Sequence, residues 1–244
     1  IGKLREQHER EKPVITVTDD EEGDTAEWIR EDGIGGSAPS GTRESGGSGD
    51  GISGDTAVSF ESDGRFYTVI SDGMGSGKEA ALTSGVCVTL LEKLIKSGAE
   101  METALKMLNR IIRASGRETS ATVDIAEIDL VTGEARFVKS GAAPSFVLRD
   151  GGIFRLQSKT VPIGIIRALD AEMIKLSLRA GDTVIMMSDG VTGSYEICPW
   201  LYDLLQNGDL GSCSPKMVAR VIGEAAIKAA EERDDITVVA MKVS

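Results

Sequence analysis

Residues Ser71–Ala80 read SDGMGSGKEA and lie between an apolar run typical of a β-strand and an amphipathic helical pattern. Gly75, Gly77 and Ala80 match the G-x-G-x-x-A pattern of dinucleotide-binding loops. The pair Gly77-Lys78 also resembles part of a phosphate-binding loop. Either match, if it were complete, would indicate a nucleotide-binding protein.

Neither nucleotide motif is complete. A phosphate-binding loop has the pattern G-x-x-x-x-G-K-[ST], but the chain has Asp72 in place of the first glycine and Glu79 in place of the hydroxyl residue. A carboxylate at position 72 would also repel the phosphates that such a loop holds. A dinucleotide-binding unit would continue into another strand, whereas two helical patterns, 78–97 and 101–114, follow here. The sequence therefore argues against nucleotide binding.

The composition of the 244-residue chain limits its class and its partners. With 41% hydrophobic residues, the chain can fill the core of one full-sized domain. A net charge of -12 disfavours binding to nucleic acid or to anionic membranes, because both repel an acidic surface. The three cysteines show no paired spacing, which argues against disulfides and zinc and favours a cytoplasmic setting. No apolar run could span a membrane and the chain starts without Met, so we expect a soluble part of a longer protein.

The chain divides into two regions of different composition. Residues 1–50 combine a charged leader with a segment rich in glycine and serine, which is typical of flexible linkers. Within this region, residues 13–17 and 26–30 are short strand candidates, and the sequence does not choose which of them adds an edge strand to the domain. Residues 51–244 are predicted to form that domain.

From residue 56 onward, hairpin patterns are followed by pairs of helical patterns. Apolar residues spaced three or four apart predict helices over residues 78–97, 101–114, 199–206 and 214–232. Runs rich in β-branched and aromatic residues, separated by turn residues, predict strands. These strands cover residues 56–61, 66–71, 121–130, 135–141, 145–150, 153–157, 172–178, 183–190 and 235–243. The order predicts a mixed α/β fold of four layers, with two antiparallel sheets that carry helices on their outer faces.

Acidic residues recur where the predicted strands begin or end. Asp72 and Asp189 each follow an apolar strand within the sequence Ser-Asp-Gly, whereas Asp55, Asp234 and Asp235 open strands. One Asp-Gly pair is most often only a turn, but two copies beside further strand-end acids indicate a cluster of carboxylates. Such a cluster needs a cation, because like charges a few ångströms apart repel each other. Ligation by oxygen alone favours Mg²⁺ or Mn²⁺ over Zn²⁺.

Six short motifs occur in order along the chain. They are SGD (53–55), SDGMGSG (71–77), GAAPSFVLR (141–149), VPIGI (161–165), GDTVIMMSDGV (181–191) and DDITVV (234–239). Together they resemble the phosphatase domain of the stage II sporulation protein E family, which belongs to the PP2C-like, metal-dependent serine/threonine phosphatases. The resemblance covers residues 52–243 and implies an α-β-β-α sandwich with two antiparallel sheets flanked by helix pairs.

Transferred position by position, the resemblance implies a centre with two Mn²⁺ or Mg²⁺ ions. Asp72 would bridge the two ions, and the backbone carbonyl of Gly73 would be a further ligand. The other implied ligands are Asp55, Asp189 and Asp234.

The resemblance also implies a reaction, a substrate and a setting. The reaction is hydrolysis of phosphoserine by metal-activated water, without a covalent intermediate. The implied substrate is a phosphorylated anti-anti-sigma factor with a STAS domain, whose dephosphorylation activates a sporulation sigma factor. Relatives self-associate, which implies a homodimer or larger assembly, and they carry this domain as the cytoplasmic C-terminal part of a membrane protein.

Two points stay open at the level of sequence. Asp235 occupies a position where the wider family often has asparagine, so we expect it to lie beside the ligands and not on a metal. The alternative function is a non-catalytic interaction module that keeps the phosphatase fold. Four mutually repelling carboxylates argue against this alternative, because a module without catalytic duty has no reason to keep them.

Overall fold

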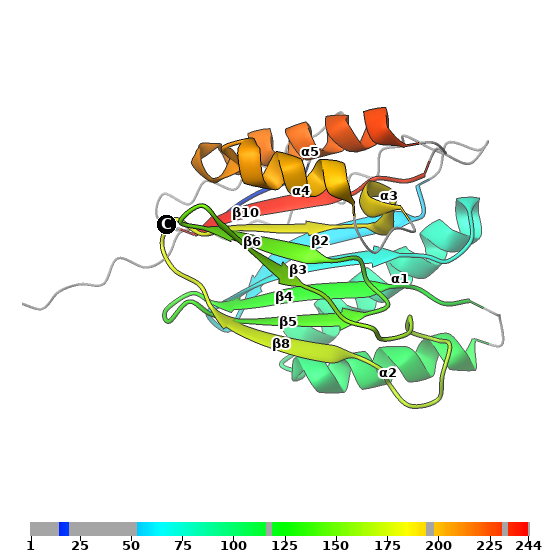
Figure 1. The fold of residues 1–244 in the computed structure, drawn as a ribbon. Coiled ribbons are helices and arrows are strands. Elements are labelled where there is room, and N and C mark those ends of the chain that lie inside the picture. The colour runs from blue at the N-terminus through cyan, green and yellow to red at the C-terminus, as the bar shows by residue number, and fades with distance from the viewer. Residues whose placement is uncertain (1–14, 20–52, 116–118, 194–197, 231–233, 244) are drawn as a thin grey trace, which may run out of the picture.

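Two five-stranded antiparallel sheets lie face to face between two layers of helices (Figure 1). This computed structural model describes residues 15–19, 53–115, 119–193, 198–230 and 234–243. The β3 sheet has the strand order β2-β3-β4-β5-β8, and the β9 sheet has the order β1-β10-β9-β6-β7. The predicted four-layer α-β-β-α sandwich is confirmed.

The strand bounds follow the predicted hairpins closely. The β3 sheet consists of β2 (Asp55–Ser62), β3 (Arg65–Asp72), β4 (Val123–Asp129), β5 (Glu134–Ser140) and β8 (Glu172–Ser177). The β9 sheet consists of β1 (Ile15–Asp19), β6 (Ser145–Arg149), β7 (Gly152–Leu156), β9 (Thr183–Met187) and β10 (Val238–Val243). Of the two early strand candidates, 13–17 overlaps β1 at the edge beside β10, and 26–30 lies outside the described residues. The boundary between residues 50 and 51 lies outside them too and stays a prediction.

Four helices of at least nine residues cover the outer faces of the sheets. Helices α1 (Gly77–Lys96) and α2 (Met101–Ala114) lie on the β3 sheet, and α4 (Pro199–Asn207) and α5 (Pro215–Ala229) lie on the β9 sheet (Figure 1). Proline in the first turn of both α4 and α5 suits a position where no backbone donor is needed. The short helices α3 (Asp189–Thr192) and η1 (Leu210–Ser212) were not predicted.

The core forms three apolar layers, one at each boundary between the four layers. Phe137, Met186 and Met241 lie in the layer between the two sheets. The other two layers lie between each sheet and its helices, with Leu91 in one and Ile222 in the other. Because side chains alternate along a strand, each sheet contributes one face to the inter-sheet layer and the other to its helices.

The strand register brings the acidic motifs of both sheets to one end of the sandwich. Asp55 and Asp72 lie directly opposite each other on β2 and β3. In the β9 sheet, Met187 pairs with Val238, so the residues after β9 and before β10 lie at the same end. This is the right-hand end in Figure 1, where α3 begins.

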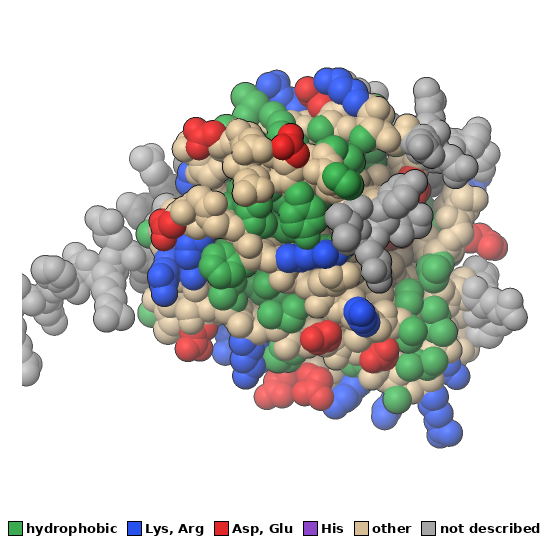
Figure 2. Space-filling model, viewed as in Figure 1, with side chains coloured by type: hydrophobic (Ala, Val, Ile, Leu, Met, Phe, Trp, Pro, Cys, Tyr) green, Lys and Arg blue, Asp and Glu red, His purple; other side chains and the backbone are tan. Residues whose placement is uncertain are grey.

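The outer surface carries charges of both signs. In the face that Figure 2 shows, acidic and basic side chains are interspersed over the described part of the chain and form no broad basic patch. This distribution agrees with the net charge of -12. Among the described residues, no helix combines the length and the apolar character needed to cross a membrane.

Candidate metal centre

Asp55 is the most buried of the four acids Asp55, Asp72, Asp189 and Asp234, with 5% of its surface exposed. Thr237 Oγ1 donates a hydrogen bond of 2.7 Å to Asp55 Oδ2, and the Ser188 hydroxyl also hydrogen-bonds to this carboxylate. Burial raises the pKa of Asp55 to about 7; the two hydroxyls lower it, and the charges of Asp235 and Asp189 add to the rise. Neutral donors from the β9 sheet thus hold a carboxylate of the β3 sheet.

Asp72 is fixed through its backbone. Its N–H donates to Thr122 Oγ1 at 3.1 Å, and its carbonyl accepts from the N–H of Thr122 at 2.8 Å. These bonds leave the carboxylate free to face the site. Burial raises the pKa of Asp72 to about 8, and the charges of Asp55 and Asp189 raise it further.

Asp189 approaches Asp72 from the opposite sheet. It is the first residue of α3, and its charge is close enough to raise the pKa of Asp72. The protein atoms around its carboxyl group and the charge of Asp234 raise its pKa, although part of the residue is exposed. The charge of Asp234 also acts on Asp72. The structure therefore brings Asp55, Asp72, Asp189 and Asp234 to one place.

The glycines of both Ser-Asp-Gly motifs are required by close approach of another backbone. A Cβ atom on Gly73 would overlap the carbonyl oxygen of Ala80 in α1, and one on Gly190 would overlap the carbonyl oxygen of Asp235. The Gly73 N–H donates to the Gly54 carbonyl at 3.1 Å, which holds the two strand ends together. The repeated dipeptide is thus not a simple turn, because each glycine lets a second segment pack against the acid before it.

Asp235 supports the backbone in front of Asp55. Its Oδ2 accepts a hydrogen bond of 2.6 Å from the N–H of Gly54. Its Oδ1 is buried, and it has no hydrogen-bond partner among the described residues. Asp235 therefore contacts the loop that carries Asp55.

The donor set at this end suits a hard divalent cation. The described side chains here offer carboxylate and hydroxyl oxygens, which Mg²⁺ and Mn²⁺ prefer. Within the described ranges, no group of three or more His, Cys, Asp or Glu side chains is already arranged so that it could hold a metal ion. Burial and the charges of Asp55 and Asp189 raise the pKa of Asp72, so the ionised carboxylates repel one another here. A bound cation would relieve this repulsion, so the residues fit a metal.

Several hydroxyl residues of the site were missed at the level of sequence. Ser188 and Thr237 contact Asp55, and the Ser188 hydroxyl also accepts the Thr237 N–H at 2.9 Å. Ser71 donates to the carbonyl of Thr122 at 2.8 Å. The sequence feature that could have predicted Ser71 and Ser188 is the serine before Asp in both Ser-Asp-Gly copies. Each of these serines hydrogen-bonds to the backbone beside a neighbouring strand.

The paired sheets, the flanking helices and the acids from both sheets define the class of PP2C-type serine/threonine phosphatase domains, which depend on metal ions. A family model described as Stage II sporulation protein E (SpoIIE) matches residues 62–244. The chain therefore belongs to the SpoIIE family.

Individual relatives agree with this assignment. The chain is 33% identical over 202 residues to stage II sporulation protein E of Bacillus subtilis (strain 168), a match that covers 79% of this chain and 24% of the relative. The chain thus spans about a quarter of that protein's length. The solved PP2C phosphatase domain of SpoIIE from B. subtilis, with a fragment of its regulatory domain, has a TM-score of 0.74 at 27% identity, covering 96% of this chain and 63% of that one. RsbX in complex with magnesium shares the fold, with a TM-score of 0.63 at 18% identity over 83% of this chain and 92% of that one.

Proposed function

We propose that this chain is a Mn²⁺- or Mg²⁺-dependent protein serine phosphatase that holds two ions with Asp55, Asp72, Asp189, Asp234 and the carbonyl of Gly73. The observation that carries the proposal is the approach of Asp72 and Asp189 from opposite sheets, which is close enough for the charge of Asp189 to raise the pKa of Asp72. A bound cation would stabilise the ionised forms of carboxylates that lie this close together. The family assignment supports the same reaction class.

The chain's own residues prepare these ligands for hydrolysis of a phosphoserine ester. Ions held by these residues would supply activated water and would neutralise the charge that develops on the phosphoryl oxygens. Thr237 and Ser188 orient Asp55 and favour its ionised form, which is the form that binds a cation. Thr122 holds the backbone of Asp72, so that its carboxylate and the neighbouring Gly73 carbonyl keep a fixed spacing.

A covalent cysteine mechanism has no support among the described residues. Cys87 is fully buried in the layer between α1 and the β3 sheet. Burial raises the pKa of its thiol to about 12, so the nucleophilic thiolate does not form near neutral pH. Direct attack of water on phosphorus is the mechanism that the site supports.

The proposed substrate is a phosphorylated anti-anti-sigma factor of the STAS type, and the proposed outcome is activation of a sporulation sigma factor. The sporulation family supports this choice, as does a 26% identity over 126 residues with B. subtilis RsbU, which is named a phosphoserine phosphatase and of which 38% is covered. We also propose self-association, at least as a homodimer, and a cytoplasmic place within a longer membrane-anchored protein. The net charge of -12 argues against direct binding of this segment to nucleic acid or membrane.

The test is metal-dependent release of phosphate by the purified chain. Wild type is assayed with a phosphorylated STAS protein and with an aryl phosphate, in chelator and in Mn²⁺. We expect turnover only with Mn²⁺, loss of turnover in Asp72→Asn, and normal turnover in Asp63→Asn. Asp63 is a matched control because it is an exposed acid at the opposite end of the same hairpin. If wild type binds the STAS protein but shows no metal-dependent turnover, the non-catalytic module is the better description.

A further inference from the structure

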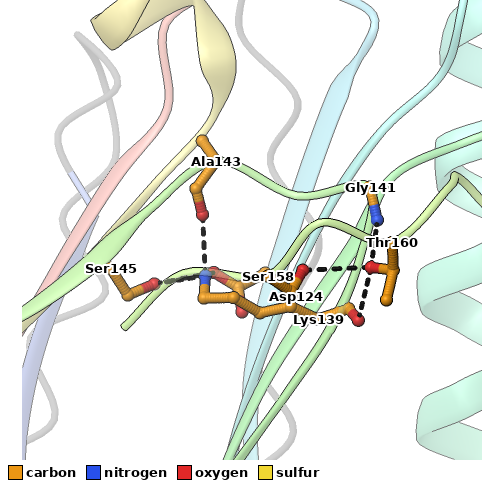
Figure 3. Close-up of polar contacts among 7 residues, drawn as sticks. All are labelled: Asp124, Lys139, Gly141, Ala143, Ser145, Ser158 and Thr160. Carbon is orange, nitrogen blue, oxygen red and sulfur yellow. Dashed lines mark hydrogen bonds and ion pairs between the residues drawn. The ribbon is translucent and has the colours of Figure 1, made fainter. Parts of the chain in front are cut away.

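A fully buried lysine of the β3 sheet lies between the two sheets (Figure 3). Lys139 of β5 has 0% of its side chain exposed. Its ammonium group donates to Asp124 Oδ2 at 2.5 Å, to Ser145 Oγ at 2.8 Å and to the Ala143 carbonyl at 2.7 Å. Ser145 Oγ also donates to Asp124 Oδ2 at 2.8 Å, which closes the cluster. We call Asp124, Lys139 and Ser145 the inter-sheet cluster.

The inter-sheet cluster joins the two sheets. Asp124 and Lys139 are opposite each other on β4 and β5, both in the β3 sheet. Ser145 is the first residue of β6 in the β9 sheet, and Ala143 belongs to the segment that crosses from one sheet to the other. Figure 3 shows the lysine side chain extending from β5 to meet both groups. Three donors of one ammonium group thus contact both sheets.

The same strands carry the two halves of the candidate metal centre. On one side, Asp124 lies two residues after Thr122, which binds the backbone of Asp72. On the other side, β6 pairs with β9, which leads directly to Asp189. The separation of Asp72 and Asp189 therefore depends on how β4 and β6 are spaced at this end.

The chemistry of the cluster favours a role beyond filling space. Burying an ammonium and a carboxylate is costly, and apolar side chains of similar size usually stabilise a core as well or better. The hydrogen bonds of the ammonium group offset that cost only if their geometry is fixed, because its three N–H donors must meet three oxygens at once. Burial lowers the pKa of Lys139, while Asp124 raises it, which agrees with a charge held by its partners.

We propose that Lys139 is a positioning residue that sets the spacing of the two sheets at the metal end and thereby the affinity of the site for its cations. The proposal rests on the proposed function, since it assumes that Asp72 and Asp189 bind metal together. Lys139 itself does not contact the ligands; it acts through β4 and β6.

The test compares two variants that remove the ion pair of Lys139 with a control variant that removes a different ion pair at the opposite end of β6. The variants are Lys139→Met, the double variant Asp124→Leu with Lys139→Met, and the control Arg149→Met. Arg149 is the last residue of β6 and forms an ion pair with the buried Asp182. The control therefore breaks an ion pair at the end of β6 that lies away from the inter-sheet cluster. The double variant is expected to fold, because removing both charges leaves no buried unpaired ion.

The measurement is Mn²⁺ binding to the whole chain, detected through the electron paramagnetic resonance signal of free Mn²⁺. Thermal melting of each variant is measured in parallel. We expect the dissociation constant to rise about 10-fold or more in both Lys139 variants, the range seen when groups that orient metal ligands are removed. We expect no change in the control, and melting of the double variant near that of wild type. A double variant that melts like wild type and binds Mn²⁺ like wild type would overturn the proposal. A wild-type chain that binds no Mn²⁺ would instead overturn the proposed function, so the two failures are distinguishable.

Discussion

The acids of the candidate metal centre and the buried acids at the opposite end of the sandwich lie in different surroundings. At the end away from the site, Asp182 is 1% exposed and forms two hydrogen bonds with Arg149, at 2.5 and 2.7 Å. Glu127 is equally buried and pairs with Arg65 at 3.0 Å and with Arg136. At the site, by contrast, the carboxylates face one another and neutral hydroxyls.

This difference separates charges that the chain neutralises itself from charges that it leaves for a ligand. Arg149 matches Asp182 with a planar, two-donor contact, so that end is complete without any other molecule. Asp55 and Asp72 have raised pKa values because burial and neighbouring acids disfavour their charge. An arginine at the site would stabilise the fold and abolish cation binding, so its absence there among the described neighbours of Asp55 is what a metal centre requires.

The largest effect is expected when the acidic end loses a carboxylate. Under the proposed function, Asp189→Asn lowers kcat about 10³-fold, which corresponds to about 4 kcal/mol of lost transition-state stabilisation. The metal-free variant should melt no lower than wild type, because a repulsive charge has gone. Phosphate release with Mn²⁺ and melting in chelator measure the two quantities. A lower melting temperature with unchanged turnover would break the comparison, since it would make Asp189 a structural residue.

The paired end should respond in the opposite sense. Arg149→Met leaves Asp182 buried without its cation, and we expect a loss of about 3 kcal/mol in the free energy of unfolding. Turnover per folded molecule should stay unchanged, because Arg149 and the acidic end lie at opposite ends of β6 and β9. Urea titration and an assay corrected for the folded fraction check this prediction. The conservative control is Arg149→Lys, which keeps the charge and should lose less stability.

Much of this contrast was predictable from the sequence, and the part that was not depends on long-range pairing. The Ser-Asp-Gly repeat placed Asp72 and Asp189 at strand ends, because an apolar run followed by turn residues marks such an end locally. The partners of Lys139 could not be predicted, since a lysine at the end of a strand pattern normally points to solvent. It is buried because Asp124 lies opposite it and β6 of the other sheet covers it. The hydroxyl of Thr237, 182 positions from Asp55, was missed for the same reason.

The acidic end should also give the metal-free protein an unusual pH dependence. Asp55 and Asp72 have pKa values of about 7 and about 8 in the folded chain, against 3.8 as their ordinary value. Between these limits the folded chain holds protons that the unfolded chain has released, so stability falls as pH rises. Each such proton corresponds to about 1.4 kcal/mol per pH unit.

Melting in chelator from pH 5 to pH 8 measures this slope. We expect Asp72→Asn to reduce the slope, because one of the two titrating groups is then an amide, and Arg149→Met to keep the slope at lower overall stability. Saturating Mn²⁺ should also flatten the slope in wild type, since a cation takes the place of the protons. Equal slopes in wild type and Asp72→Asn would show that Asp72 does not titrate in this range.

The smallest expected effect comes from a neutral donor at the acidic end. Thr237→Val keeps the shape of the side chain but removes the 2.7 Å hydrogen bond to Asp55, which costs about 1 kcal/mol. Since this bond lowers the pKa of Asp55, its loss raises that pKa and leaves less of the carboxylate ionised at pH 7. Mn²⁺ should therefore bind more weakly in the variant at pH 7, and the difference should narrow at pH 9, where Asp55 is ionised in both proteins. If Thr237→Val cost as much stability as Arg149→Met, the hydroxyl would be serving as a counter-charge, and the two ends of the sandwich would differ less than their residues indicate.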